Sequence, residues 1–300
     1  MGILLAFGAA IATSLTNIFT KIGIGEEVDS KFATAYKTLI VILFSIIICL
    51  ISGAIYRFDE FTWENYLYLS LSGIFTGCSW IFYNRALQLG NVNKVAPIDK
   101  SSFILTNILF IIFFFDDTTK NGNWLKILLI VFSSILMLTG TILMIAKKKA
   151  DNVPESKKWI IYAVLSAISA SFVALFVKLG IKNTPSELGT LYRTLVVFVF
   201  ASIIAIFSGG YKCVKTINKK SWTFLTLAGI ATGVAWLLEY SALNIVDNNP
   251  IAVTSIEKFS ILLTMLFSFL VLKEKFTKRM LIGLALLTAG IIVAILINYF

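Results

Sequence analysis

The sequence predicts an all-α integral membrane protein in which ten transmembrane helices form two inverted five-helix repeats. Three observations lead to this prediction. Hydrophobic residues make up 58% of the 300 residues and charged residues only 14%, whereas soluble domains carry about 25% charged residues. Ten apolar segments have the roughly 20 residues that a helix needs to cross a bilayer. The motifs of the first five segments return, altered, in the last five.

The ten segments follow one another with little chain between them. We expect helices over residues 3–22, 31–54, 66–87, 95–115, 124–146, 159–181, 188–207, 221–243, 251–272 and 280–298. The first segment lacks the basic start of a signal peptide. Its end, Phe19-Thr-Lys-Ile-Gly-Ile24, returns as Phe176-Val-Lys-Leu-Gly-Ile181. The first segment therefore belongs to the fold.

The later segments of the two halves also correspond. In the second and seventh, Thr34-Ala-Tyr-Lys-Thr-Leu39 matches Thr190-Leu-Tyr-Arg-Thr-Leu195. In the third and eighth, Leu71-Ser-Gly-Ile-Phe-Thr-Gly-Cys-Ser-Trp80 matches Leu227-Ala-Gly-Ile-Ala-Thr-Gly-Val-Ala-Trp236. In the fourth and ninth, the acid and lysine of Asp99-Lys100 match Glu257-Lys258. The fifth and tenth complete two copies, which we place at residues 1–146 and 159–300, around a basic cytoplasmic linker at 147–158.

A repeat with an odd number of helices must enter the membrane from opposite faces in its two copies, which gives an inverted repeat. The basic residues agree with this arrangement. Loops after odd segments carry Lys31, Lys94, Lys147, Lys148, Lys149, Lys157, Lys158, Lys212, Lys215, Lys219, Lys220, Lys273, Lys275, Lys278 and Arg279, and loops after even segments carry Arg57, Lys120, Lys126 and Lys182. Because cytoplasmic loops collect Lys and Arg, we expect a multi-pass protein of the cytoplasmic membrane with both termini outside.

The composition excludes several classes of function. The chain has no histidine, which rules out histidine catalysis and histidine proton relays, and its three cysteines lack the paired spacing of a metal or disulfide framework. There is no nucleotide-binding loop. The net charge of +10 is explained by the basic loops that set the orientation of the protein in the membrane. Because no basic patch is interleaved with stacking aromatic residues, nucleic acid is not an expected partner. We expect no catalytic residue, metal or cofactor.

Charged residues inside the fourth and ninth segments are the first candidate site. An ionisable residue in a lipid-spanning segment costs free energy and indicates a functional role or a specific partner. Asp99, Ser102 and Thr106 share one helix face, and Glu257 shares another with Ser260, Thr264 and Ser268. Each lysine lies about 100° around the helix from its neighbouring acid, so its partner is elsewhere. Three roles stay open for Lys100 and Lys258: lining or gating a central cavity, bracing two helices, or snorkelling to an interface.

The third and eighth segments carry a second constellation on one face each, formed by Gly73, Gly77, Trp80 and Asn84 and by Gly229, Gly233, Trp236 and Tyr240. Small residues four apart let helices approach closely, either within the fold or in a homodimer. The tryptophans suit either cation binding through the ring face or interface anchoring.

The halves differ at Glu239, where the first half has Tyr83. Glu239 and Glu257 are candidate proton or cation ligands, unless a salt bridge to Arg193, Lys37 or Lys178 keeps them ionised. Near helix ends we expect contacts with water or lipid headgroups for Lys21, Lys37, Lys178 and Arg193.

The first copy contains six further motifs, which are Thr20-Lys-Ile-Gly-Ile24, Val28-Asp-Ser, Ala33-Thr-Ala, Gly77-Cys-Ser-Trp80, Arg85-Ala-Leu-Gln-Leu-Gly90 and Lys94-Val-Ala-Pro-Ile-Asp-Lys-Ser101. These motifs resemble those of the bacterial and archaeal five-helix EamA-type family of the drug/metabolite transporter superfamily. The resemblance covers residues 1–146, and residues 159–300 look like a more divergent copy. Glu274 resembles an acidic residue common at that position of EamA repeats, with Asp116 as its weaker counterpart. The resemblance implies a ten-helix secondary transporter with a cavity between its halves.

We therefore expect a transporter, most simply an exporter, of a small polar metabolite such as an amino acid or amine, possibly coupled to protons. The alternatives are a non-transporting sensor or assembly protein and, with less support, an intramembrane enzyme. Packing alone could also preserve the repeat. The expected partners are a small-molecule substrate, the lipid bilayer and a second copy of the chain. The candidate cavity residues are Lys100, Lys258, Asp99, Glu257, Trp80, Trp236, Asn84, Tyr240, Glu239, Ser102 and Ser260.

Overall fold

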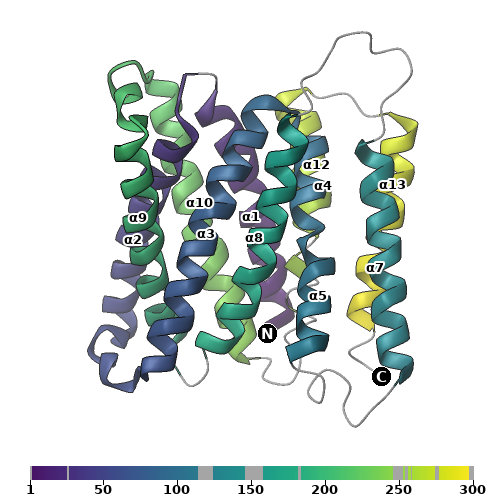
Figure 1. The fold of residues 1–300 in the computed structure, drawn as a ribbon, viewed down its shortest axis with the longest axis horizontal. Coiled ribbons are helices and arrows are strands. Elements are labelled where there is room, and N and C mark those ends of the chain that lie inside the picture. Colours follow the sequence, from purple (N-terminus) through teal and green to yellow (C-terminus); the bar gives the residue numbers. More distant parts are fainter. Residues whose placement is uncertain are drawn as a thin grey trace.

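The computed structural model is a bundle of long α-helices that run side by side (Figure 1). It describes residues 2–25, 27–113, 124–145, 158–181, 184–245, 253, 256–257, 259–273 and 277–296. The long helices are α1 (Gly2–Ile24), α2 (Ser30–Ser52), α3 (Trp63–Leu89), α4 (Val92–Lys100), α5 (Ser102–Phe113), α7 (Trp124–Ile145), α8 (Lys158–Gly180), α9 (Ser186–Phe207), α10 (Lys219–Ile245), α12 (Ser260–Leu272) and α13 (Lys278–Leu296). Short 3-10 helices are η1 (Ala54–Tyr56), η2 (Phe58–Glu60) and η3 (Gly210–Lys215).

Local sequence signals set several helix ends. The Asp29 carboxylate accepts a hydrogen bond from the backbone N–H of Lys31 at 2.8 Å and so caps the start of α2. Thr62 and Asn65 form a capping box at the start of α3. Gly53 ends α2 in the left-handed conformation, with φ 71°, which glycine adopts without steric cost.

Each of the ten predicted segments overlaps a described helix. Within the described residues, eight helices are long and apolar enough to cross a membrane, with α4 and α5 counted together as the span Lys94–Phe113. Of the remaining two segments, α3 has 27 residues but is more polar, and the described part of the ninth segment, α12, has 13 residues. The expectation of an all-helical membrane protein is therefore confirmed at the level of a multi-pass bundle.

The fourth segment departs from the continuous helix expected over residues 95–115. α4 ends at Lys100, and α5 begins at Ser102. The backbone N–H of Ser101 donates to the carbonyl oxygens of Pro97 and Ile98 at 3.0 and 3.1 Å, and its hydroxyl donates to Ile98 at 2.6 Å. Serine hydroxyls that bond back to the preceding turn bend helices, and Pro97 removes one helix hydrogen bond nearby. The helix is therefore interrupted next to the predicted charged pair.

Equivalent helices of the two halves make equivalent contacts. α3 packs on α8 as α10 packs on α1, and α3 packs on α9 as α10 packs on α2. α4 and α5 pack on α8 as α12 packs on α1. At one side of the bundle α7 and α13 lie against each other (Figure 1). The contacts therefore relate the two halves by an approximate twofold symmetry.

Glycines at equivalent positions make the closest of these contacts possible. A Cβ atom on Gly77 of α3 would lie 2.5 Å from the ring of Phe200 on α9, and one on Gly233 of α10 would lie 2.6 Å from the ring of Phe44 on α2. The small-residue faces of the third and eighth segments are thus covered within the chain, and a homodimer stays a prediction.

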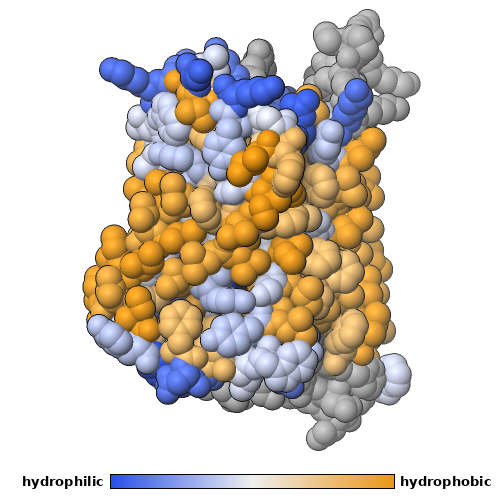
Figure 2. Space-filling model, turned by 60° about the vertical axis from the view of Figure 1, so that its left-hand side comes forward, coloured by the Kyte–Doolittle hydropathy of each residue, from blue (hydrophilic) through white to orange (hydrophobic). Residues whose placement is uncertain are grey.

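The outer surface suits a bilayer. Figure 2 shows a broad apolar band between hydrophilic ends of the bundle. Large exposed apolar side chains from several helices contribute to it, among them Leu43, Ile47, Ile135, Val199, Ile203 and Ile282. Helix α1 begins and helix α13 ends at the same end of the bundle (Figure 1).

Candidate functional site

A central cavity of about 380 Å³ lies between the two halves. Its wall is formed by α1, α2, α3, α4 and α5 of the first half, by α8, α9 and α10 of the second, and by Glu257. Cavities that hold small molecules typically have about 300–1,000 Å³. The cavity is therefore large enough for a metabolite of the size of an amino acid, and both halves contribute to its wall.

Two tryptophans from equivalent positions meet in this cavity. The ring centroids of Trp80 on α3 and Trp236 on α10 are 5.2 Å apart, with an interplanar angle of 37°. The Nζ atom of Lys37 lies 4.6 Å from the centroid of the Trp80 ring, and Cζ of Arg193 lies 4.4 Å from that of Trp236. A cation over an indole gains about 0.5–2 kcal/mol, more when water is excluded. Each half thus contributes one cation–indole unit.

Lys37 and Arg193 are buried, which corrects the expectation that they meet water or headgroups. Only 3% of Lys37 and 4% of Arg193 is exposed. Lys37 donates to the hydroxyl of Thr20 at 3.2 Å and to the side-chain oxygen of Asn84 at 3.5 Å, and Arg193 donates to the hydroxyl of Thr76 at 3.1 Å. Both lie about two turns inside their helices, and their side chains extend to the tryptophan pair at the centre of the bundle rather than to its rim.

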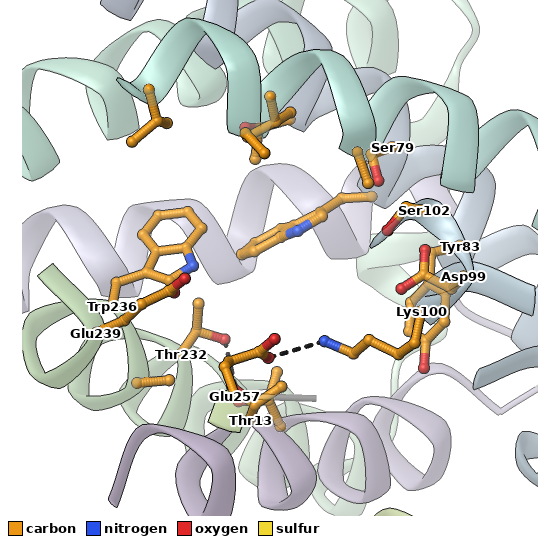
Figure 3. Close-up of a pocket in the computed structure, with 18 of the residues that line it drawn as sticks. Thr13, Ser79, Tyr83, Asp99, Lys100, Ser102, Thr232, Trp236, Glu239 and Glu257 are labelled. Atoms are coloured by element: carbon orange, nitrogen blue, oxygen red, sulfur yellow. Dashed lines mark hydrogen bonds and ion pairs between the residues drawn. The ribbon is translucent and has the colours of Figure 1, made fainter. Parts of the chain in front are cut away.

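The ion pair of Lys100 with Glu257 joins the halves. Lys100 Nζ lies 2.9 Å from Glu257 Oε1 (Figure 3). The Ser260 hydroxyl donates to the same oxygen at 3.5 Å. Glu257 is the repeat counterpart of Asp99, so the lysine of the first copy pairs with the acid of the second. Lys100 therefore both braces two helices and lies on the cavity wall.

Asp99 is tied to two other helices. The hydroxyl of Ser166 on α8 donates to Asp99 Oδ1 at 2.6 Å, and Ser166 and Ser79 of α3 lie within 3.1 Å of each other through their hydroxyl oxygens. The site therefore has both acidic and basic groups, and hydroxyl groups bond to the acids Asp99 and Glu257 and to the cations Lys37 and Arg193.

Two lysines at equivalent positions of the repeats have different surroundings. Lys21 Nζ donates to the carbonyl oxygens of Leu87 and Gly90 at the end of α3, the latter at 2.9 Å. Its repeat counterpart, Lys178, lies on the cavity wall with Nζ 5.1 Å from the centroid of the Phe110 ring. The same pair of positions thus caps a helix in one half and lines the cavity in the other.

The lining continues toward the end of the bundle where the chain begins, because it includes Phe110 near the end of α5 and Ile181 directly after α8. Toward the opposite end, an apolar cluster fills the space between α1, α3, α4 and α8. Its buried members are Ile18, Tyr83, Ala86, Leu87, Val92, Val95, Ala96, Ile98, Trp159 and Ala163. The cavity therefore extends closer to the end of the bundle at which α1 begins.

The predicted site residues have three kinds of location. The cavity wall includes Lys100, Asp99, Glu257, Trp80, Trp236, Glu239 and Ser102. Asn84 and Ser260 are fully buried outside the lining, behind Lys37 and Glu257. Lys258 and the side chain of Tyr240 lie outside the described residues, as do Glu274 and Asp116.

Sequence reasoning missed several lining residues. They include Lys37, Arg193, Thr20, Thr76, Asn17 and Lys178. The repeat itself carried a usable signal for the two cations, because Lys37 and Arg193 are equivalent positions in the same way as Trp80 and Trp236. The threonines gave no comparable signal, since Thr and Ser are common in apolar helices.

Comparisons with known proteins agree on the family. The EamA-like transporter family profile matches residues 1–139 and 157–296. A curated relative from Sinorhizobium sp, described as an "Uncharacterized transporter in cobO 3'region", is 34% identical over 135 residues, which are 45% of this chain and 94% of the relative. A solved crystal structure, described only as that of a protein, matches with a TM-score of 0.69 and 17% identity over 99% of this chain and 97% of the other, which shows a shared fold. The resemblance read from the motifs is confirmed, and the chain belongs to the EamA-like transporter family.

Proposed function

We propose that this membrane transporter is a secondary active exporter of a small polar metabolite, such as an amino acid or amine, in the cytoplasmic membrane. It works by alternating access, with ten crossings, inverted repeats and both termini outside. The observation that carries the proposal is the central cavity, to which the two halves contribute the equivalent pairs Trp80 and Trp236, Lys37 and Arg193, and Asp99 and Glu257. Inverted repeats place substrate sites at such an interface.

The difference between the two cavity ends supports alternating access. If the halves exchange conformations, Lys178 takes over the helix-capping role of Lys21, and the cavity becomes accessible from the other face. The interrupted fourth segment lies where such a movement needs backbone adjustment. Proton coupling is supported by the carboxylates of Asp99, Glu239 and Glu257 on the cavity wall, because intramembrane acids are the usual proton carriers of transporters.

The first test asks whether the Lys100–Glu257 pair serves transport or only stability. Removing one partner of a buried ion pair costs about 3–5 kcal/mol, whereas replacing both by apolar residues of similar size is often neutral. We expect the double variant Lys100→Met/Glu257→Met to fold and to abolish flux in proteoliposomes. Folded yield is measured by size-exclusion chromatography and flux with a ligand found by thermal-shift screening.

If the double variant transports the ligand as fast as the wild-type protein does, the ion pair serves only to hold the helices together. Ligand binding without any flux by the wild-type protein would leave a receptor and would refute transport. A C-terminal activity tag tests the orientation separately, and a signal from the cytoplasm would reverse it.

A further inference from the structure

We propose that Lys37 binds a carboxylate of the substrate, so that the transported metabolite is an amino acid or related small carboxylate and not a simple amine. The inference rests on the proposed transport function and deepens it by naming the group that is recognised. The observation behind it is a cation on the cavity wall whose partners, in the described part of the chain, carry no charge.

The surroundings of Lys37 are polar but neutral. Its ammonium group donates to the Thr20 hydroxyl and the Asn84 side-chain oxygen and lies over the Trp80 ring. A lysine that is 3% exposed within a membrane segment normally pairs with a carboxylate or a backbone carbonyl. An ammonium group has three N–H donors, so two hydroxyl and amide acceptors leave one donor for a ligand.

The other cations on the cavity wall have partners already. Lys100 pairs with Glu257 at 2.9 Å, Arg193 interacts electrostatically with Glu239, and Lys178 lies over Phe110. Among the described residues, the lining contains four cations, Lys37, Lys100, Lys178 and Arg193, and three carboxylates, Asp99, Glu239 and Glu257. A ligand carboxylate at Lys37 therefore gives this ammonium group a negative partner, whereas a ligand with an amine alone would add a further positive charge.

Asn84 prepares Lys37 for this role. The Asn84 amide nitrogen donates to the Thr34 hydroxyl at 2.8 Å and to the Ser30 carbonyl at 3.4 Å, which turns its oxygen toward Lys37. A group held in this way loses little freedom when a ligand binds. The second half cannot repeat the arrangement, because Val177 and Tyr240 stand where the first half has Thr20 and Asn84. The structure thus gives one carboxylate subsite rather than two.

The experiment compares ligands that differ only by the carboxylate. The probes are the common L-amino acids, the amines formed by removing their carboxylates, such as isoamylamine for leucine and phenethylamine for phenylalanine, and carboxylates without the amine, such as 3-phenylpropionate. Thermal shifts of the purified full-length protein give the ranking, and calorimetry gives the affinities. We expect at least one carboxylate to stabilise the protein and its matching amine not to. The proposal is overturned if an amine stabilises the protein as much as the matching amino acid does. It is also overturned if none of the carboxylates stabilises the protein.

Variants then assign the effect to Lys37. Loss of a charged hydrogen bond should weaken binding of the best carboxylate about 10- to 100-fold in Lys37→Met, and Lys37→Arg should restore part of it. Asn84→Asp gives Lys37 a carboxylate from the protein itself and should weaken binding similarly while the lysine is kept. Lys219→Met, at an exposed position, is the matched control and should bind normally.

The outcomes separate this inference from the proposed function. Unchanged carboxylate affinity in both Lys37→Met and Asn84→Asp refutes the subsite even if flux is present. Carboxylate binding that depends on Lys37, without flux in proteoliposomes, supports the subsite and refutes transport.

Discussion

The two cation–indole units occupy equivalent positions in the repeats but have different partners. Lys37 lies over Trp80 and bonds to Thr20 and Asn84, all within its own half. Arg193 lies over Trp236 but donates across the interface to Thr76 on α3. The comparison indicates that duplication supplied two similar units, and that one now joins the halves whereas the other is available to a ligand.

The largest expected difference comes from removing each cation. Arg193→Met removes the hydrogen bond to Thr76 and the electrostatic attraction to Glu239, and should lower the free energy of unfolding by about 1.5–3 kcal/mol. Lys37→Met should cost less than about 1 kcal/mol, because the loss of the hydrogen bonds to two neutral acceptors is offset by no longer burying an ammonium group. Thermal unfolding in detergent measures both. Equal losses would mean that the two units have the same structural role.

The glycines behind the two units should give a matched, intermediate effect. Gly77→Ala and Gly233→Ala each place a methyl group against a ring, 2.5 Å from Phe200 and 2.6 Å from Phe44. Overpacking of this kind costs about 1–3 kcal/mol. Gly189→Ala is the control, because its nearest atom would lie at 3.6 Å. A clear difference in unfolding between Gly77→Ala and Gly233→Ala would contradict equivalent packing in the halves.

The smallest effects should come from the indoles themselves. Phenylalanine keeps the ring but binds a cation less well, by about 0.5–1 kcal/mol. Trp236→Phe should therefore reduce stability slightly, and Trp80→Phe should weaken carboxylate binding about two- to fivefold. Trp222→Phe, which packs on Phe32 and Tyr36, is the control and should leave binding unchanged. If Trp80→Phe reduced stability and Trp236→Phe weakened carboxylate binding, the roles inferred for the two cation–indole units would be reversed.

Much of the fold could be predicted because length and apolar composition alone specify membrane helices. The repeat followed from motifs such as those ending at Trp80 and Trp236, which are visible without any structure. The break at Ser101 was missed because it depends on a local hydrogen bond to Ile98 that competes with a strongly apolar pattern. Composition therefore predicts the existence of a helix better than its continuity.

The site was predicted less completely than the fold. Helix geometry correctly required a distant partner for Lys100, but its identity as Glu257 depends on how α4 meets the ninth segment. The depth of Lys37 and Arg193 was misjudged, because distance along the sequence from a helix end does not tell which way a long side chain extends. Lys258 lies outside the described residues, and its proposed role therefore stays a prediction.

The glycine contacts have a consequence for how the protein is synthesised and assembled in the membrane. Gly77 and Gly233 each fit a ring supplied by the other half, so neither half contains the partner for its own close-packed face. During synthesis the first half enters the membrane before the second exists. Until the second half is made, the faces of the first-half helices that pack on it remain in contact with lipid. Assembly is therefore completed only after the second half has been synthesised, and a delay in its synthesis lengthens the time in which the first half can misassemble.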